Sequence, residues 1–105
     1  MATAKIFAGN CNFTTYVTAS NESEGMVHLT IESECPHIQK IAEELTRVNP
    51  FNEISFHSEH GPQIMNVMRQ SCPHASCPVF SGIIRAVEVE AGLALPTNIS
   101  IELES

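Results

Sequence analysis

Hydrophobic and polar positions alternate with a period of two along the first third of the chain, which predicts β-strands. A short apolar run over residues 4–8 ends at a Gly-Asn turn signal. Residues 13–19 and 26–33 then alternate on either side of a polar, glycine-containing segment, residues 21–25. Two alternating runs around such a segment are typical of a β-hairpin, so three strands are expected before residue 34.

The period changes at Pro36. From there the apolar side chains recur at the spacing of an amphipathic helix: Ile38, Ile41, Ala42, Leu45 and Val48. The dipeptide Asn49-Pro50 is expected to stop this helix. The sequence therefore predicts one helix that covers the stretch between the hairpin and Pro50.

The remaining chain predicts a mixture of helices and short strands. Residues 54–56 are expected to form a short strand, residues 62–70 a second helix and residues 79–95 a largely buried third helix. Gly82 indicates close packing in that helix, because glycine costs a helix roughly 1 kcal/mol relative to alanine. Residues 98–103 alternate again and predict a last strand. This order predicts a single α+β domain over residues 1–105, an antiparallel sheet of about four strands with two to three helices packed on one face.

Composition and charge exclude several classes of function. The chain has 105 residues, 43% of them hydrophobic and 16% charged, which argues for one packed core and against disorder. Its net charge is −7 and its five basic residues are scattered, which argues against a nucleic-acid-binding patch. No signal peptide and no apolar run of about 20 residues is visible, so we expect a cytoplasmic protein that does not enter a membrane. Cysteines in that compartment are usually reduced, and act as ligands or redox groups.

Three of the four cysteines are followed by proline: Cys35, Cys72 and Cys77. Proline is favoured at the first position of a helix, so the residue before it is a natural N-cap. We expect Cys35 and Cys77 to be such N-caps, where the helix dipole favours thiolate over thiol. Cys72 is expected to end the second helix, and Cys11 to lie in the turn before the second strand.

All four cysteines are expected at the boundaries of elements, where ligands and reactive groups are usually presented. Four thiolates match the ligand count of zinc and of an iron–sulfur cluster, and the sequence favours neither over the other. Only Cys72 and Cys77 are close in sequence, and no complete zinc or ferredoxin motif is present. The predicted site consists of Cys11, Cys35, Cys72 and Cys77, with His74 as a further candidate ligand. His37 follows the first Cys-Pro in the same way, but a surface position is the simpler interpretation for it.

These observations lead to one hypothesis and two alternatives. The hypothesis is a small metal- or iron–sulfur-binding protein that acts in electron transfer, in cluster or metal handling, or as an accessory subunit of a protein partner. The first alternative is a thiol-based redox enzyme with Cys77 or Cys35 as a nucleophile of low pKa. The second is an interaction module in which the cysteines only pack. The sequence assigns no catalytic residue, names no partner and leaves a homodimer open.

Two segments carry a resemblance to a known group of proteins. The stretch Ser33-Glu34-Cys35-Pro36-His37-Ile38 and the run from Cys72 through Cys77-Pro78-Val79 to residue 96 resemble a small uncharacterised Cys-Pro-His family, found mainly in anaerobic bacteria and archaea. The resemblance covers most of the chain. It implies that the four cysteines belong together and that an anaerobic host favours an iron–sulfur cluster, but it implies no activity.

Overall fold

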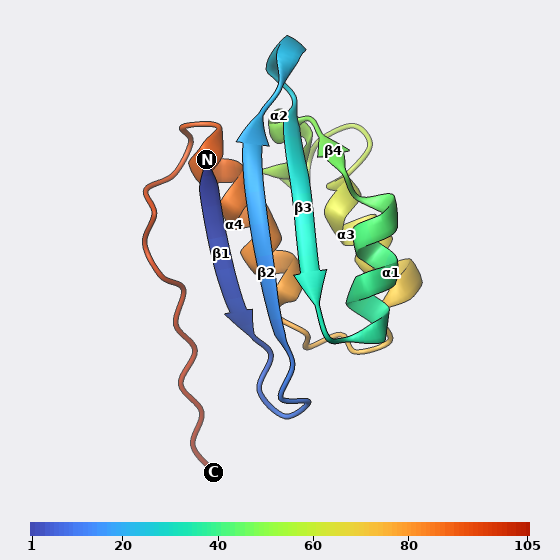
Figure 1. Ribbon diagram of the computed structural model, residues 1–105. Helices are drawn as coiled ribbons and strands as arrows, with labels where there is room; N and C mark the ends of the chain where they lie inside the picture. The colour runs from blue at the N-terminus through green and yellow to red at the C-terminus, as the bar shows by residue number, and fades with distance from the viewer.

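Four antiparallel strands form one sheet in the computed structural model, which describes residues 1–105 (Figure 1). They are β1 (Ala2–Phe7), β2 (Thr14–Asn21), β3 (Val27–Ser33) and β4 (Arg47–Val48), and their order in the sheet is their order in the sequence. A 3-10 turn, η1 (Ser23–Gly25), joins β2 to β3. The three long strands confirm the three strands expected before residue 34, and the α+β class is confirmed with them.

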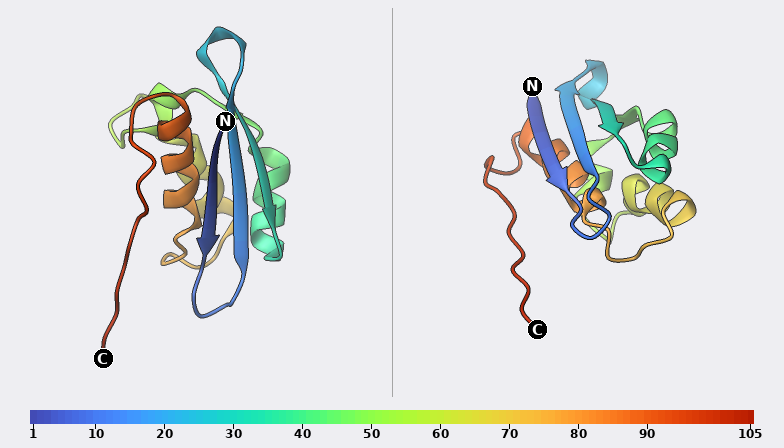
Figure 2. Two further views of the ribbon diagram at one scale, coloured as in Figure 1. Left: turned by 60° about the vertical axis from the view of Figure 1, so that its left-hand side comes forward. Right: turned by 60° about the horizontal axis from the view of Figure 1, so that its bottom comes forward.

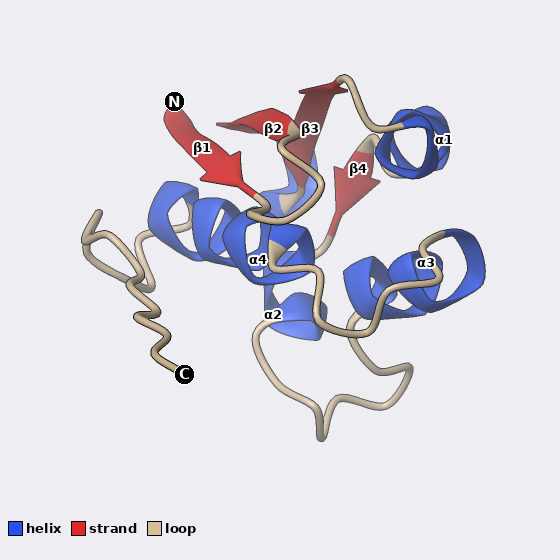
Figure 3. Ribbon diagram, turned by 90° about the horizontal axis from the view of Figure 1, so that it is seen from below, coloured by secondary structure: helices blue, strands red, loops and turns tan.

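The four helices are α1 (Pro36–Glu44), α2 (Pro50–Glu53), α3 (Gln63–Ser71) and α4 (Val79–Glu90). Helices α1 and α4 pack on the sheet, and α2 and α3 pack mainly on other helices. Helix α4 contacts β1 and β2, α1 contacts β3, and α3 lies between α1 and α4 (Figure 3). None of the helices combines the length and the apolar character that a span across a membrane requires.

The core lies between the sheet and the helices. Every second residue of β2 and β3 faces it, and helix residues at three- and four-residue spacing meet them: Val17, Ala19, Val27, Leu29, Ile31, Ile38, Ile41, Leu45, Ile64, Val67, Met68, Val79, Ile83, Ala86 and Val87. The opposite face of the sheet exposes Tyr16, Thr30 and Glu32. A Cβ atom at Gly82 would overlap the side chain of Ile6, so the close packing predicted at this glycine is confirmed.

The fourth strand lies elsewhere than predicted. Helix α1 ends at Glu44, and Arg47 and Val48 then pair with β3 instead of continuing the helix. Residues 54–56 form no strand, because α2 directly precedes them and is capped by the Asn49 side chain, which accepts a hydrogen bond from the Phe51 N–H at 3.1 Å. Val48 is fully buried in β4, so its apolar character reflects a strand position and its helical spacing was misleading.

Two further predictions fail near the end of the chain. Helix α4 ends at Glu90 because Gly92 adopts a left-handed conformation (φ 77°) and the N–H of Leu93 donates to the Glu88 carbonyl at 2.8 Å. This is the Schellman arrangement that closes many helices. Residues 98–103 form no strand, because no neighbouring strand lies beside them to complete a hydrogen-bonded ladder (Figure 2).

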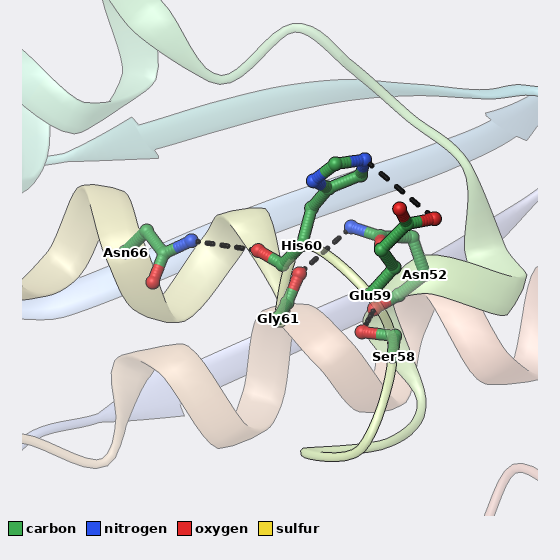
Figure 4. A network of polar contacts seen from close by, with 6 residues as sticks. All are labelled: Asn52, Ser58, Glu59, His60, Gly61 and Asn66. Carbon is green, nitrogen blue, oxygen red and sulfur yellow. Dashed lines mark hydrogen bonds and ion pairs between the residues drawn. The ribbon is translucent and has the colours of Figure 1, made fainter.

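The connection between α2 and α3 is held by side-chain hydrogen bonds rather than by an apolar core (Figure 4). Asn52 Nδ2 donates to the Gly61 carbonyl at 2.8 Å, and Asn66 Nδ2 donates to the His60 carbonyl at 3.2 Å. Glu53 is 1% exposed, and its carboxylate accepts from the N–H groups of Gln63 and Ile64, the first two residues of α3. A buried acidic side chain therefore caps α3 from ten residues upstream.

Candidate functional site

All four cysteines lie on connections at one end of the sheet, which we call the cysteine end: residues 8–13, 34–35 and 72–78. Cys11 is in the β1–β2 connection, Cys35 lies between β3 and α1, and Cys72 and Cys77 flank the α3–α4 connection. Figure 3 views the molecule from this end, and Figure 1 shows the same connections at the bottom. The fold thus brings to one end three connections that are far apart in the sequence.

Cys35 is the N-cap of α1, as predicted, with Pro36 as the first helical residue. Its thiol makes no capping hydrogen bond to the helix, so the sulfur remains available to bind a ligand. Its backbone N–H donates to Ser33 Oγ at 3.1 Å, and Ser33 Oγ accepts at 2.8 Å from the hydroxyl of Thr15, which is buried on β2. This hydroxyl chain fixes the backbone at Cys35. Sequence reasoning missed it, although Thr15 stands out as a polar residue on an inward-facing position.

The α3–α4 connection holds the next two cysteines close together. Cys72 is the C-cap of α3, as predicted, and its thiol donates to the His74 carbonyl at 3.8 Å. The same carbonyl accepts from the N–H of Cys77 at 3.2 Å, which makes a tight turn. Cys77 is not the N-cap of α4 as predicted, because Pro78 takes that position and the helix begins at Val79.

Both Cys72 and Cys35 influence the thiol of Cys77. Burial raises the pKa of Cys77 above its ordinary value, and the N–H of Val79, which hydrogen-bonds to the sulfur, lowers it. The charge of Cys72, a hydrogen bond between the two thiols and the charge of Cys35 raise that pKa again. The thiolate expected at Cys77 is therefore disfavoured, because burial and the neighbouring sulfurs outweigh the helix start.

A histidine pair spans the same two segments. His37, in the first turn of α1, and His74, in the α3–α4 connection, meet edge to face with ring centroids 6.0 Å apart and an interplanar angle of 85°. His74 is exposed and His37 is half-buried. The two Cys-Pro-His tripeptides thus face each other across the cysteine end, a contact that their sequence separation could not reveal.

Cys11 stands apart from the other cysteines. It is exposed in a turn closed by a hydrogen bond from the Asn12 N–H to the Gly9 carbonyl, 2.8 Å. Thiolate and imidazole are the donors that zinc prefers, and thiolates are those that iron–sulfur clusters prefer, so the residue types fit both groups. No three His, Cys, Asp or Glu side chains are arranged for metal coordination as they stand. The structure places Cys35, Cys72 and Cys77 on two connections at the same end of the sheet, and both Cys72 and Cys35 affect the pKa of Cys77.

A polar cavity of about 440 Å³ lies at the opposite end, lined by Met26, Asn49, Asn52, His60, Gln63 and Asn66. Two of these amides, Asn52 and Asn66, already hold the α2–α3 connection (Figure 4). The cavity is open and contains no cysteine, so its residues have a structural explanation and the candidate site stays at the cysteine end.

Comparison with known proteins gives one match. A family model described as a family of unknown function (DUF6951) matches residues 2–103. The chain belongs to this family, which confirms the expectation of an uncharacterised family. No curated protein and no solved structure matches the chain.

Proposed function

We propose that this member of the DUF6951 family binds one metal ion or iron–sulfur cluster at the cysteine end through Cys35, Cys72 and Cys77. The observation that carries the proposal is that the fold places Cys35, Cys72 and Cys77 on two connections at one end of the sheet, although Cys35 and Cys72 are 37 residues apart in sequence. Cys11 and His74 are the candidate fourth ligands, because their segments lie at the same end (Figure 3).

The electrostatics of the three thiols support a bound cation. Burial and then the charges of Cys72 and Cys35 raise the pKa of Cys77, so the Cys77 thiol resists deprotonation when no positive charge is near. A metal ion removes that resistance, because thiolates that repel one another are each attracted to it. The Val79 N–H at the Cys77 sulfur would then hydrogen-bond to a ligating thiolate, a contact that tunes the potential of redox-active centres.

The biological role that we propose is electron transfer, cluster or metal handling, or service as an accessory subunit of a cytoplasmic protein partner. A bound iron–sulfur cluster would supply one-electron chemistry, whereas zinc would supply none. The resemblance of the Cys-Pro-His segments to proteins of anaerobic bacteria and archaea supports the cluster in a host of that kind. The acidic surface, with a net charge of −7, supports a protein partner over a nucleic acid.

The experiment is anaerobic purification followed by metal analysis, a visible spectrum, and separate reconstitution with Zn²⁺ and with iron and sulfide. We expect stoichiometric metal that is lost in the Cys35→Ser, Cys72→Ser and Cys77→Ser variants. Cys11→Ser is the matched variant, since it removes an exposed thiol at the same end and shows whether that residue is the fourth ligand. A colourless, metal-free protein with four titratable thiols, which stays so after reconstitution, would exclude the proposal.

A thiol–disulfide function is the second candidate, favoured by the position of Cys72 and Cys77 at the two ends of one tight connection, where Cys72 affects the pKa of Cys77. Exchange with a disulfide-bonded partner would join these two sulfurs, and the partner would leave with two electrons and two protons as a dithiol. The raised pKa of Cys77 makes it a poor attacking thiol, so Cys72 would have to attack first. A Cys72–Cys77 disulfide that forms reversibly in glutathione buffers, in protein that takes up no metal, would favour this function.

A further inference from the structure

The last residues of the chain have the pattern of a strand but no strand beside them. Ile99, Ile101 and Leu103 alternate with Ser100, Glu102 and Glu104, and Ile101 and Leu103 are 73% and 89% exposed. Alternation of apolar and polar side chains is typical of a half-buried β-strand. It is unusual in an exposed segment that pairs with no other strand. The family model extends to residue 103, so the pattern belongs to the family's own region.

The sheet has an unpaired edge strand, β1, whose side chains alternate between the core and solvent. β1 is an edge strand, paired only with β2, and its outer backbone groups at residues 3–7 have no strand beside them. Ala4 and Ile6 point toward the core, whereas Lys5 and Phe7 point to solvent. An unprotected edge is a template for another strand, and such pairing is a common mode of recognition.

We propose that residues 100–104 of a second copy of this chain pair with β1, and that a dimer forms by reciprocal exchange of this segment. Residues opposite each other in paired strands point to the same face of a sheet. If Glu102 lies beside Lys5, then Ile101 and Leu103 lie beside Ala4 and Ile6 on the core side. In the antiparallel register that sets Glu102 opposite Lys5, Leu103 faces Ala4 and Ile101 faces Ile6. Lys5 is the only basic residue of β1, so this register pairs opposite charges as well as apolar side chains.

The path of residues 98–105 favours pairing with β1 of a second copy over pairing with β1 of the same chain. Ile99 lies in an open groove on the outer side of α4 with Ile84 and Arg85, and not at β1. Beyond it the chain runs away from the body (Figure 2). No backbone hydrogen bond joins the segment to its own β1. Each copy therefore has both an unpaired segment, residues 100–104, and an unpaired β1 edge. Two copies can exchange these segments reciprocally about a two-fold axis.

Sedimentation velocity of the full chain tests the proposal, from about 5 µM to about 1 mM, the range in which weak association is detected. A reducing agent is present throughout because Cys11 is exposed and could link two copies. We expect a monomer–dimer equilibrium in the full chain, and a monomer in a variant that ends at Thr97. Ile101→Asp is expected to abolish the dimer while leaving the far-UV circular dichroism and the melting temperature of the monomer unchanged, because this side chain is exposed.

The register is tested by charge reversal. Lys5→Glu and Glu102→Lys are each expected to weaken the dimer about 2- to 25-fold, because a cross-strand pair contributes a factor of about 1.5 to 5 and the dimer contains two such pairs. The double variant should restore the affinity, and Glu104→Lys is the matched control for a change of net charge. A full chain that stays monomeric, or a dimer that persists without residues 98–105, would overturn the proposal. It would equally be overturned if removal of the segment exposed β1 amides to hydrogen exchange in a monomer, since the segment would then pair within its own chain.

Discussion

Replacement of Glu53 tests whether α3 depends on a remote cap. The carboxylate is 1% exposed and accepts three hydrogen bonds, from the N–H groups of Gln63 and Ile64 at 3.0 and 2.8 Å and from Asn52 Nδ2 at 2.9 Å. The residue at the N-cap position, Pro62, offers no side-chain hydrogen bond of its own. Without Glu53, the buried N–H of Ile64 would have no acceptor, and the partly buried N–H of Gln63 would lose its own.

The expected loss follows from these contacts. Each buried donor without an acceptor costs about 1–3 kcal/mol, and a carboxylate at a helix N-terminus contributes about 0.3–2 kcal/mol more. The cost of burying the carboxylate offsets part of that sum. The donors are backbone N–H groups, however, so they remain in the protein whatever side chain replaces Glu53. We therefore expect Glu53→Ala to lower the free energy of unfolding by about 3–5 kcal/mol, a large share of the about 5–15 kcal/mol of a typical domain. Glu53→Gln keeps one acceptor oxygen and should cost about 1–2 kcal/mol.

Urea unfolding followed by far-UV circular dichroism measures these changes, and the signal suits a chain that contains no tryptophan. Glu59→Gln is the matched control, because its carboxylate lies in the same connection and is exposed, so it should change stability by less than about 0.5 kcal/mol. Hydrogen exchange should also show that amides of α3 lose protection first in Glu53→Ala. A Glu53→Ala protein as stable as the Glu59→Gln control would refute the capping argument.

Three further changes test the packing, the thiols and the pH dependence. Gly82→Ala should destabilise the protein by about 1 kcal/mol, because the added methyl group overlaps the Ile6 side chain. In an Ile6→Ala background the same change should stabilise the protein by about 1 kcal/mol, because alanine favours the helix over glycine. Equal effects in both backgrounds would contradict the packing of Gly82 against Ile6. In metal-free protein, Cys77 should be alkylated more slowly than the exposed Cys11, as mass spectrometry of peptides would show, because its pKa is raised by burial; the reverse order would contradict this. The pKa of Glu90 is lowered first by the backbone N–H that hydrogen-bonds to it from β2, so its stabilising effect is present above its unfolded pKa and is lost as pH falls through its folded pKa. Unfolding curves of Glu90→Gln should therefore differ from those of the unaltered protein at pH 7 and approach them in acid.

The sheet and the main helices were predictable because their pattern is local. The alternation around Val17 and Leu29 can bury one face only as strands, and the spacing of Ile38 and Ile41 can do so only as a helix. Local pattern was misleading at Val48, where a helical position and a strand position would both bury the same side chain. The pattern was also insufficient at residues 98–103, because a strand requires a neighbour and the sequence does not show where one lies.

The candidate site was predictable in its residue types but not in its arrangement. The sequence indicates boundary positions for Cys35 and Cys72, and the structure places them there. It cannot show that the first and second Cys-Pro-His tripeptides meet, since the contact between His37 and His74 depends on how α1 and α3 pack. The cap that Glu53 provides is equally invisible in sequence, because the helix that it caps begins ten residues later across an irregular connection.

The turn between β2 and β3 projects from the sheet at the end opposite to the cysteine end (Figure 1). Its Gly25 has a left-handed conformation with open space around it, and Glu24 shares that conformation. The N–H of Glu22 donates to the Met26 carbonyl at 2.8 Å across the turn, and Arg47 forms exposed ion pairs with Glu22 and Glu24 at 3.5 and 4.0 Å. An affinity tag, fluorophore or spin label inserted here would leave both the thiols and the β1 edge untouched. The protein thus carries a natural attachment point from which metal loading and self-association can be followed in the same molecule.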